Sequence, residues 1–134
     1  LNADTIQHLG QFQQSVLILI LYPDSPYLPD ETLQFLLGIL QACRLSMADV
    51  AIVNLARHPH IRYQTLQDQF KPHYWLGFNL NLGVMEFPIQ FPEYQVQQYN
   101  HQSFVHGPAL EMIQADPAQK RQLWNALKKA FQIT

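Results

Sequence analysis

The sequence predicts an α/β domain of three layers, α/β/α, with a mostly parallel central sheet of about four strands, and two observations support this prediction. Continuous apolar runs of strand length occur at residues 15–23 and 50–56, and a segment with helical apolar spacing, residues 30–44, lies between them. Apolar runs that do not alternate are typical of strands buried on both faces of a sheet. A strand, a helix and a second strand in this order form a parallel crossover unit.

Length and composition favour one compact domain over residues 1–134. The 134 residues are 48% hydrophobic and 13% charged, which suits a single core. The formal net charge of -2 disfavours tight, unaided binding to a nucleic-acid backbone. Cys43 is the one cysteine, which excludes an internal disulfide and a cysteine-ligated iron–sulfur cluster, and no apolar run is long enough to cross a bilayer. We therefore expect a cytoplasmic protein without a membrane segment.

The first predicted strand ends in a proline-rich loop, residues 23–29, where ligands usually bind in open α/β sheets. A helix is expected over residues 30–44, with Asp30 as its N-cap and Glu31 favourable at its positive end. Its apolar face consists of Leu33, Leu36, Leu37, Leu40 and Cys43.

The middle of the chain continues with a loop, a helix and a strand. The loop 58–60 follows the second strand, residues 63–70 keep helical apolar spacing, and the aromatic run 74–79 predicts a third strand. Residues 79–92 carry dispersed glycine and proline and predict an irregular or hairpin segment.

The last third of the chain predicts two strands and two helices. Residues 94–100 alternate like a half-exposed strand, and residues 102–107 form a more buried final strand. A short helix is expected over 108–114, and residues 116–119 supply an N-cap, a proline at the first helical position and a capping-box glutamine. The buried stripe of the last helix is Leu123, Trp124, Leu127, Ala130 and Phe131.

Carboxylates and one histidine form the candidate catalytic set. Asp24, Asp30 and Glu31 cluster after the first strand, where a general base or a metal-binding carboxylate stands in many α/β enzymes. Turn and cap chemistry is the alternative interpretation, and it explains Asp30 fully. His106 ends the last buried strand and is expected at the same sheet edge, where it stabilises developing negative charge or serves as a hydrogen-bonded strand-end residue.

Other residue patterns give weaker indications of chemistry. His58 and His60 are close enough to share a metal ion, but a third ligand would have to be His101, His106 or a remote carboxylate, so ordinary loop histidines are favoured. Glycine-rich phosphate loops and a nucleophile elbow do not occur, and Cys43 lies on the apolar helix face as a core thiol. We expect no metal and no cofactor. The basic residues of the last helix form a solvated face rather than a DNA patch, and they are Lys120, Arg121, Lys128 and Lys129.

Four stretches of sequence together resemble a known superfamily. They are VLILILYPDSP at 16–26, ADVAIVNL at 48–55, FVHGPALEMIQADPAQKRQLWNAL at 104–127 and ADTIQHLGQF at 3–12. In their order along the chain and in their residues, they resemble the uracil-DNA glycosylase superfamily, and within it the psi-subunit family of the bacterial DNA polymerase III clamp loader. The resemblance implies a uracil-DNA glycosylase-like fold over nearly the whole chain.

The resemblance also bears on activity. His106 and Pro108 occupy the glycosylase His-Pro segment with Gly107 between them, and Asn54 falls near the second-strand asparagine of some glycosylases. The glycine-rich acidic loop that activates water in glycosylases is not reproduced, and psi subunits have no enzymatic activity. The resemblance therefore implies a non-catalytic DNA replication accessory protein.

Psi subunits act by bridging proteins, and the resemblance carries this role over as an expectation. Their N-terminal segment docks on clamp-loader ATPase subunits and their globular domain holds a chi subunit, so contact with DNA is only indirect. The matching positions, within residues 1–14, are Ile6, Leu9 and Phe12, whose spacing suits one face of a partner-bound helix. The alternative is that these side chains cover the sheet of their own chain.

Two further functions stay open at the level of sequence. One is a divergent uracil-DNA glycosylase in which Asp24, Asp30 or Glu31 activates water and His106 stabilises the departing base. The other is a small-ligand pocket at the sheet edge with no role in DNA metabolism.

Overall fold

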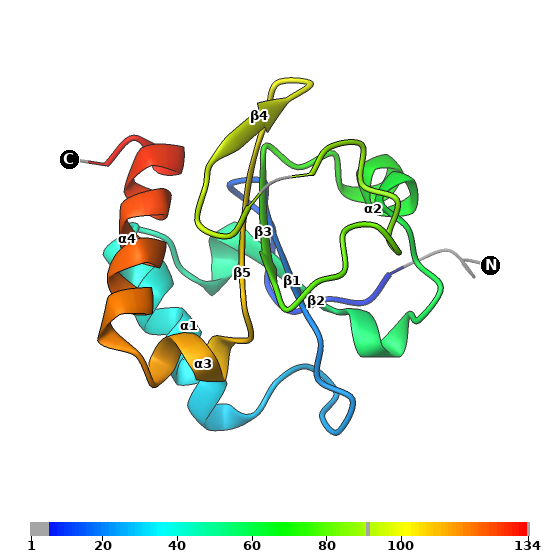
Figure 1. Cartoon of the computed structure of the whole chain (residues 1–134). Helices are drawn as coiled ribbons and strands as arrows, with labels where there is room; N and C mark the ends of the chain where they lie inside the picture. Colours follow the sequence, from blue (N-terminus) through cyan, green and yellow to red (C-terminus); the bar gives the residue numbers. More distant parts are fainter. Residues whose placement is uncertain (1–5, 91, 134) are drawn as a thin grey trace.

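A computed structural model describes residues 6–90 and 92–133, and it has an α/β fold around a five-stranded sheet (Figure 1). The strand order is β2-β1-β3-β5-β4. Four strands are parallel, namely β1 (Val16–Ile20), β2 (Val50–Asn54), β3 (Tyr74–Phe78) and β5 (Gln102–Gly107), and β4 (Gln97–Tyr99) pairs antiparallel with β5 at one edge. The predicted mostly parallel sheet is confirmed, with the half-exposed segment as a short fifth strand.

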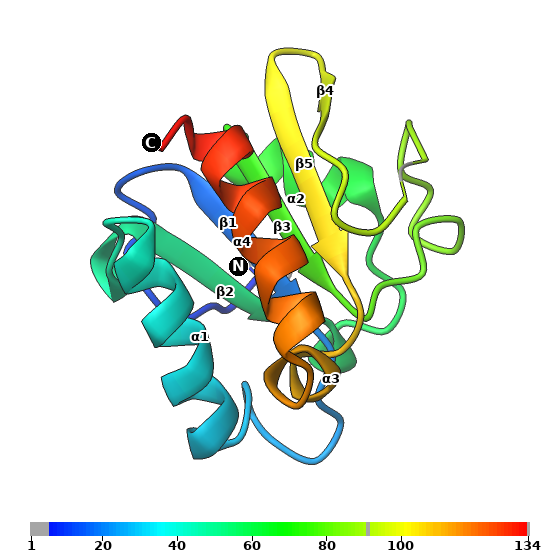
Figure 2. The ribbon, with the colours of Figure 1, turned by 60° about the vertical axis from the view of Figure 1, so that its left-hand side comes forward.

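Helices cover the two faces of the sheet unequally (Figures 1 and 2). One face packs against α1 (Asp30–Ala42), α3 (Leu110–Gln114) and α4 (Pro117–Phe131). The other face packs against α2 (Tyr63–Phe70) and the irregular segment 79–90. The arrangement has three layers, and within the described residues α2 is the one α-helix on the second face.

The alternation of β1 side chains explains its continuous apolar run. Val16, Ile18 and Ile20 face α1, α3 and α4, whereas Leu17 and Leu19 face α2, and all five are at most 1% exposed. Complete burial of one such side chain contributes about 1.5–3 kcal/mol. A strand buried on both faces has no polar face to alternate with, as the sequence predicted.

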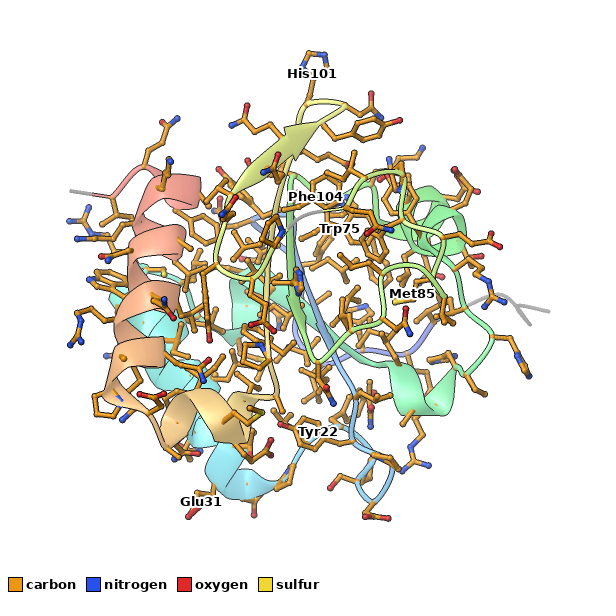
Figure 3. The ribbon with its side chains drawn as sticks, in the orientation of Figure 1. Tyr22, Glu31, Trp75, Met85, His101 and Phe104 are labelled. Atoms are coloured by element: carbon orange, nitrogen blue, oxygen red, sulfur yellow. The ribbon has the colours of Figure 1, made fainter. Side chains whose placement is uncertain are left out.

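Aromatic side chains fill the core on the α2 face. Trp75 of β3 stacks on Tyr63, at a centroid distance of 4.9 Å, and on Phe104, at 5.6 Å, and the rings of Tyr63 and Phe104 are themselves 6.4 Å apart. Phe87 from the irregular segment meets Trp75 edge-on at 5.5 Å. Figure 3 shows Trp75 and Phe104 together beside the sheet, with Met85 lying nearer the N-terminal segment. The irregular segment thus closes a core that one short helix cannot close alone.

The N-terminal segment lies along the outer edge of β2. The backbones of Leu9 and Ile52 exchange two hydrogen bonds of 3.0 and 2.9 Å, and the Phe12 amide donates to the Val50 carbonyl at 3.0 Å. Gly10 between them has a φ of 90°, in the left-handed region that favours glycine. This segment covers polar backbone groups that an exposed parallel edge would leave unpaired.

Helix boundaries differ from the predicted ones in detail. Asp30 is the first helical residue rather than the N-cap, which is Pro29, so the predicted Asp30 cap is wrong. The short helix begins at Leu110 instead of residue 108. Asp116 caps α4 as predicted by accepting the Ala118 amide at 2.9 Å. In the described part of the chain, no helix is long and apolar enough to span a membrane.

Candidate functional site

Asn54, at the C-terminal end of β2, holds the loop that follows β1. Its side chain is 1% exposed. Its Oδ1 accepts the amide of Tyr22 at 2.9 Å and that of Ala56 at 3.2 Å. Its Nδ2 donates to the carbonyl oxygens of Tyr22 and Ser25, both at 2.9 Å, and of Pro26 at 3.2 Å. These bonds use the full capacity of the amide, so Asn54 positions a loop and has no donor left for a ligand.

A cavity of about 470 Å³ lies beside this loop, at the sheet edge where ligands were expected. The guanidinium of Arg57 borders it and is itself engaged, because it donates to the carbonyl oxygens of Pro23 at 3.1 Å and Ser25 at 2.6 Å. The lining residues are Gln7, Pro26, Tyr27, Asn54, Arg57 and His58. Two of its polar side chains, Asn54 and Arg57, therefore already form hydrogen bonds to the protein's own backbone.

The candidate carboxylates and His106 come from different elements of the sheet and its helices. Asp24, Asp30 and Glu31 are exposed, and Figure 3 shows Glu31 pointing away from the molecule. His106 lies near the C-terminal end of β5, at the predicted edge, but β3 separates β5 from β1. Strand alternation puts the His106 side chain on the Phe104 side, which faces α2, whereas Asp30 and Glu31 belong to α1 on the opposite face. Asp30 and Glu31 therefore lie across the sheet from His106.

His106 is half-buried, and burial lowers its pKa below the ordinary value of 6.5. The neutral ring is thus the form that the fold accommodates. Below a pH of about 6.5 the unfolded chain takes up a proton that folded His106 resists. The free energy of unfolding therefore decreases as the pH is lowered.

We expect His106→Gln to lose less stability than the unchanged chain between about pH 7.5 and pH 5. Urea unfolding at both pH values measures this difference, and the other five histidines are common to both proteins. Equal losses in the two proteins would contradict the assignment of this proton to His106.

A polar cluster that the sequence did not reveal joins the strand end to two helices. The hydroxyl of Thr32, a 4% exposed residue in the first turn of α1, donates to the carboxylate of Glu111 in α3 at 3.2 Å. Burial, and then hydrogen bonding to Glu111, raises the pKa of Tyr22. Figure 3 shows Tyr22 beside α3. The cluster holds α1, α3 and the end of β1 together. Glu111 is 79 residues from Thr32 along the chain, so sequence spacing gives no sign of their contact.

The histidines named as metal candidates come from both ends of the sheet. His101 is in the tight turn between β4 and β5, at the far end of β5 from His106, and Figure 3 shows it projecting outward. His58 lines the cavity beside Arg57, and His60 is exposed. Across residues 6–90 and 92–133, no three His, Cys, Asp or Glu side chains are placed to hold a metal ion. Cys43 is buried, and burial raises the pKa of its thiol to about 11.

The N-terminal candidates pack on their own chain. Ile6 is 4% exposed in the α2-side core, and Phe12 meets the ring of Phe70 at a centroid distance of 5.4 Å. Leu9 is bridged to β2 and packs against the core on the α1 side. These contacts agree with the alternative in which the three residues cover their own sheet. Residues 1–5 of the predicted docking segment 1–14 lie outside the described residues.

An open groove runs between α1 and α4, in the helical layer that covers the α1 face of the sheet. It has a volume of about 340 Å³ and a mostly apolar lining. Its walls and floor are Gln34, Phe35, Gly38, Ile39 and Ala42 of α1, Ile113, and Lys120, Leu123, Trp124 and Leu127 of α4. Two lysines lie over aromatic rings that line it: the ammonium of Lys120, itself a lining residue, is 5.9 Å from the centre of the Phe35 ring, and that of Lys128 is 5.7 Å from the centre of the Trp124 ring.

A signal for the groove was present in the sequence. Phe35, Gly38, Ile39 and Ala42 have the spacing i, i+3, i+4, i+7, which is a second apolar stripe on a helix that already has a buried face. Trp124 was assigned to the buried stripe of the last helix and is only partly buried. A helix that is apolar on more than one side indicates a second contact surface.

The sequence was also compared with known proteins. No model of a known protein family and no curated protein matches this chain. The geometry of the chain itself therefore has to support any functional proposal.

Proposed function

We propose that the chain is a non-catalytic DNA replication accessory protein of the psi-subunit type, with a uracil-DNA glycosylase-like fold, which bridges clamp-loader ATPase subunits by protein contacts. The observation that carries the proposal is the open apolar groove between α1 and α4, because apolar surface left in contact with water is typical of protein-binding sites. A chi-like subunit is the expected second partner, and contact with DNA is indirect.

The geometry of the strand-end edge supports a non-catalytic role. Water activation needs a carboxylate held against the substrate, and Asp24, Asp30 and Glu31 are all exposed to solvent. Asn54, at the position that resembles a glycosylase asparagine, is saturated by backbone groups of the loop. The loop is thus organised for its own stability.

Affinity purification of the tagged chain from its own host is the test of this proposal. We expect clamp-loader or DNA polymerase III components, identified by mass spectrometry, to co-purify, and we expect a tagged unrelated α/β domain to recover none. Repeated purifications that contain no such component would overturn the proposal.

A uracil-excision assay tests the alternative function. We expect no release of uracil above background from single-stranded or duplex DNA at high protein concentration, because Asp30 and Glu31 lie on the opposite face of the sheet from His106 and all three carboxylates are exposed. Measurable release that His106→Gln reduces while folding is kept would favour the glycosylase instead.

A further inference from the structure

We propose that the groove between α1 and α4 binds one amphipathic helix of a partner protein, a helix whose apolar stripe is flanked by acidic side chains. The inference rests on the proposed function only in assuming that the chain works through protein contacts.

The composition of the groove favours a helix over a small molecule. Small-molecule sites combine apolar walls with a few convergent polar groups that fix the ligand's orientation. Here the polar lining residues are Gln34 and Lys120, and the remaining lining is apolar. A long apolar strip between two helices suits the i, i+3, i+4, i+7 anchors of a third helix.

Gly38 in the middle of α1 supports an external occupant. A glycine inside a helix costs about 1 kcal/mol relative to alanine, so its presence calls for a reason. Its φ is not positive, and a Cβ placed on it would have no heavy atom within 4 Å, so neither the backbone nor the packing of this chain requires glycine here. The empty space above Gly38 borders the groove and leaves room for a side chain of the partner to approach the α1 backbone.

The charge around the groove specifies the partner. Helix α4 holds four of the chain's eight Lys and Arg residues and no acidic residue, although the chain as a whole carries -2. Lys120 and Lys128 lie over aromatic rings at the rim. In the part of the chain that the structure describes, no carboxylate forms an ion pair with either ammonium group. Glutamate or aspartate flanking a partner's apolar stripe would supply the missing charge.

The same charges disfavour a second copy of this chain as the occupant. A two-fold dimer through this surface would place the same patch on both sides of the interface. The lysine rim of one copy would then meet the lysine rim of the other, and like charges facing each other lower affinity.

The test uses the full chain and two synthetic helical peptides. Both carry leucine at the i, i+3, i+4 and i+7 positions, and they differ only in having glutamate or lysine beside the stripe. Isothermal titration calorimetry should show that the glutamate peptide binds at least about tenfold more tightly at low salt and that added salt narrows the difference. The double reversal Lys120→Glu and Lys128→Glu should invert the preference.

Gly38→Leu fills the groove and provides the decisive variant. We expect it to weaken binding of the glutamate peptide by about tenfold or more, because its side chain enters the open space above α1. Gly83→Leu is the matched control, since Gly83 lies in an exposed turn away from the groove, with only the Asn81 side chain near an added Cβ. Circular dichroism verifies that both variants fold.

Each remaining outcome decides the proposal. Equal affinity for the two peptides, or equal weakening by Gly38→Leu and Gly83→Leu, would overturn it, and so would a dimer in solution that Gly38→Leu abolishes. Clamp-loader components that co-purify equally with the Gly38→Leu chain would overturn the groove inference and leave the proposed function standing. Selective peptide binding, with no clamp-loader component in the purification, would overturn the proposed function and leave the groove inference standing.

Discussion

Asn54→Ala is expected to lower the free energy of unfolding by about 2–4 kcal/mol. The substitution removes an amide that accepts two backbone N–H groups and donates to three carbonyl oxygens. It takes the side-chain partner away from the Tyr22 and Ala56 amides and from the Pro26 carbonyl, whereas the Ser25 carbonyl keeps Arg57 and the Tyr22 carbonyl keeps the Ser25 amide. It also leaves a cavity where the 1% exposed side chain stood. Urea unfolding, with the midpoint shifted at an unchanged slope, measures the loss.

Two controls separate the hydrogen bonds from other effects of Asn54→Ala. Asn125→Ala makes the same change at an exposed position of α4, where we expect the free energy of unfolding to change by at most about 0.5 kcal/mol. Asn54→Asp keeps the shape and the acceptor but places a carboxylate oxygen against carbonyl oxygens, so we expect a loss as large as that of alanine. If both Asn54 variants lost less than about 1 kcal/mol, the proposed stabilisation of the loop by the Asn54 hydrogen bonds would be contradicted.

The strand-end loop illustrates why the edge could be predicted from sequence and its chemistry could not. Parallel strands bring their C-terminal ends to one edge, so the positions of residues 23–29 and His106 at that edge follow from strand order alone. The side of the sheet that His106 faces depends on register, and a shift of one residue reverses it. Phe104 and Val105 lie on opposite faces, which settles the side only once the pairing is known.

A helix start could be predicted from sequence where the interactions that fix it lie within one turn. Asp116, followed by Pro117, begins α4 because an acceptor side chain and a fixed φ act within one turn. Asp30 has the same acceptor, but Pro29 takes the cap position in extended backbone and Asp30 becomes the first helical residue. The sequence pattern does not distinguish two helix starts that differ by one residue.

The groove depends on how two helices are spaced, which periodicity alone does not specify. The apolar face of α1 was assigned from leucines, and of these Leu36 and Leu40 are at most 1% exposed. The second stripe, beginning at Phe35, is equally regular and faces α4 without being covered by it. Whether such a stripe is buried by its own chain depends on the distance between helices, and that distance is set by packing against α4, which begins 75 residues after α1 ends, at Pro117 against Ala42.

Two identical glycine substitutions are expected to change stability in opposite directions, and the difference follows from backbone geometry. Gly10→Ala should lower the free energy of unfolding by about 3 kcal/mol. Gly10 has a φ of 90°, and an added Cβ would lie 2.1 Å from the Val50 carbonyl oxygen and 2.6 Å from that of Met47. Both obstacles are backbone atoms, one in β2 itself and one in the turn just before it, so they cannot rotate away as a side chain would.

Gly38→Ala is the counterpart, and it should raise the free energy of unfolding by about 0.5–1 kcal/mol. Gly38 is helical and its surroundings are open, so alanine gains helix propensity without a clash. Urea unfolding of both variants and of the unchanged chain gives the two signs in one series. A Gly10→Ala chain as stable as the unchanged one would mean that residues 9–14 do not pair with the edge of β2. Ile6, Leu9 and Phe12 would then be free to leave the sheet and bind a partner protein.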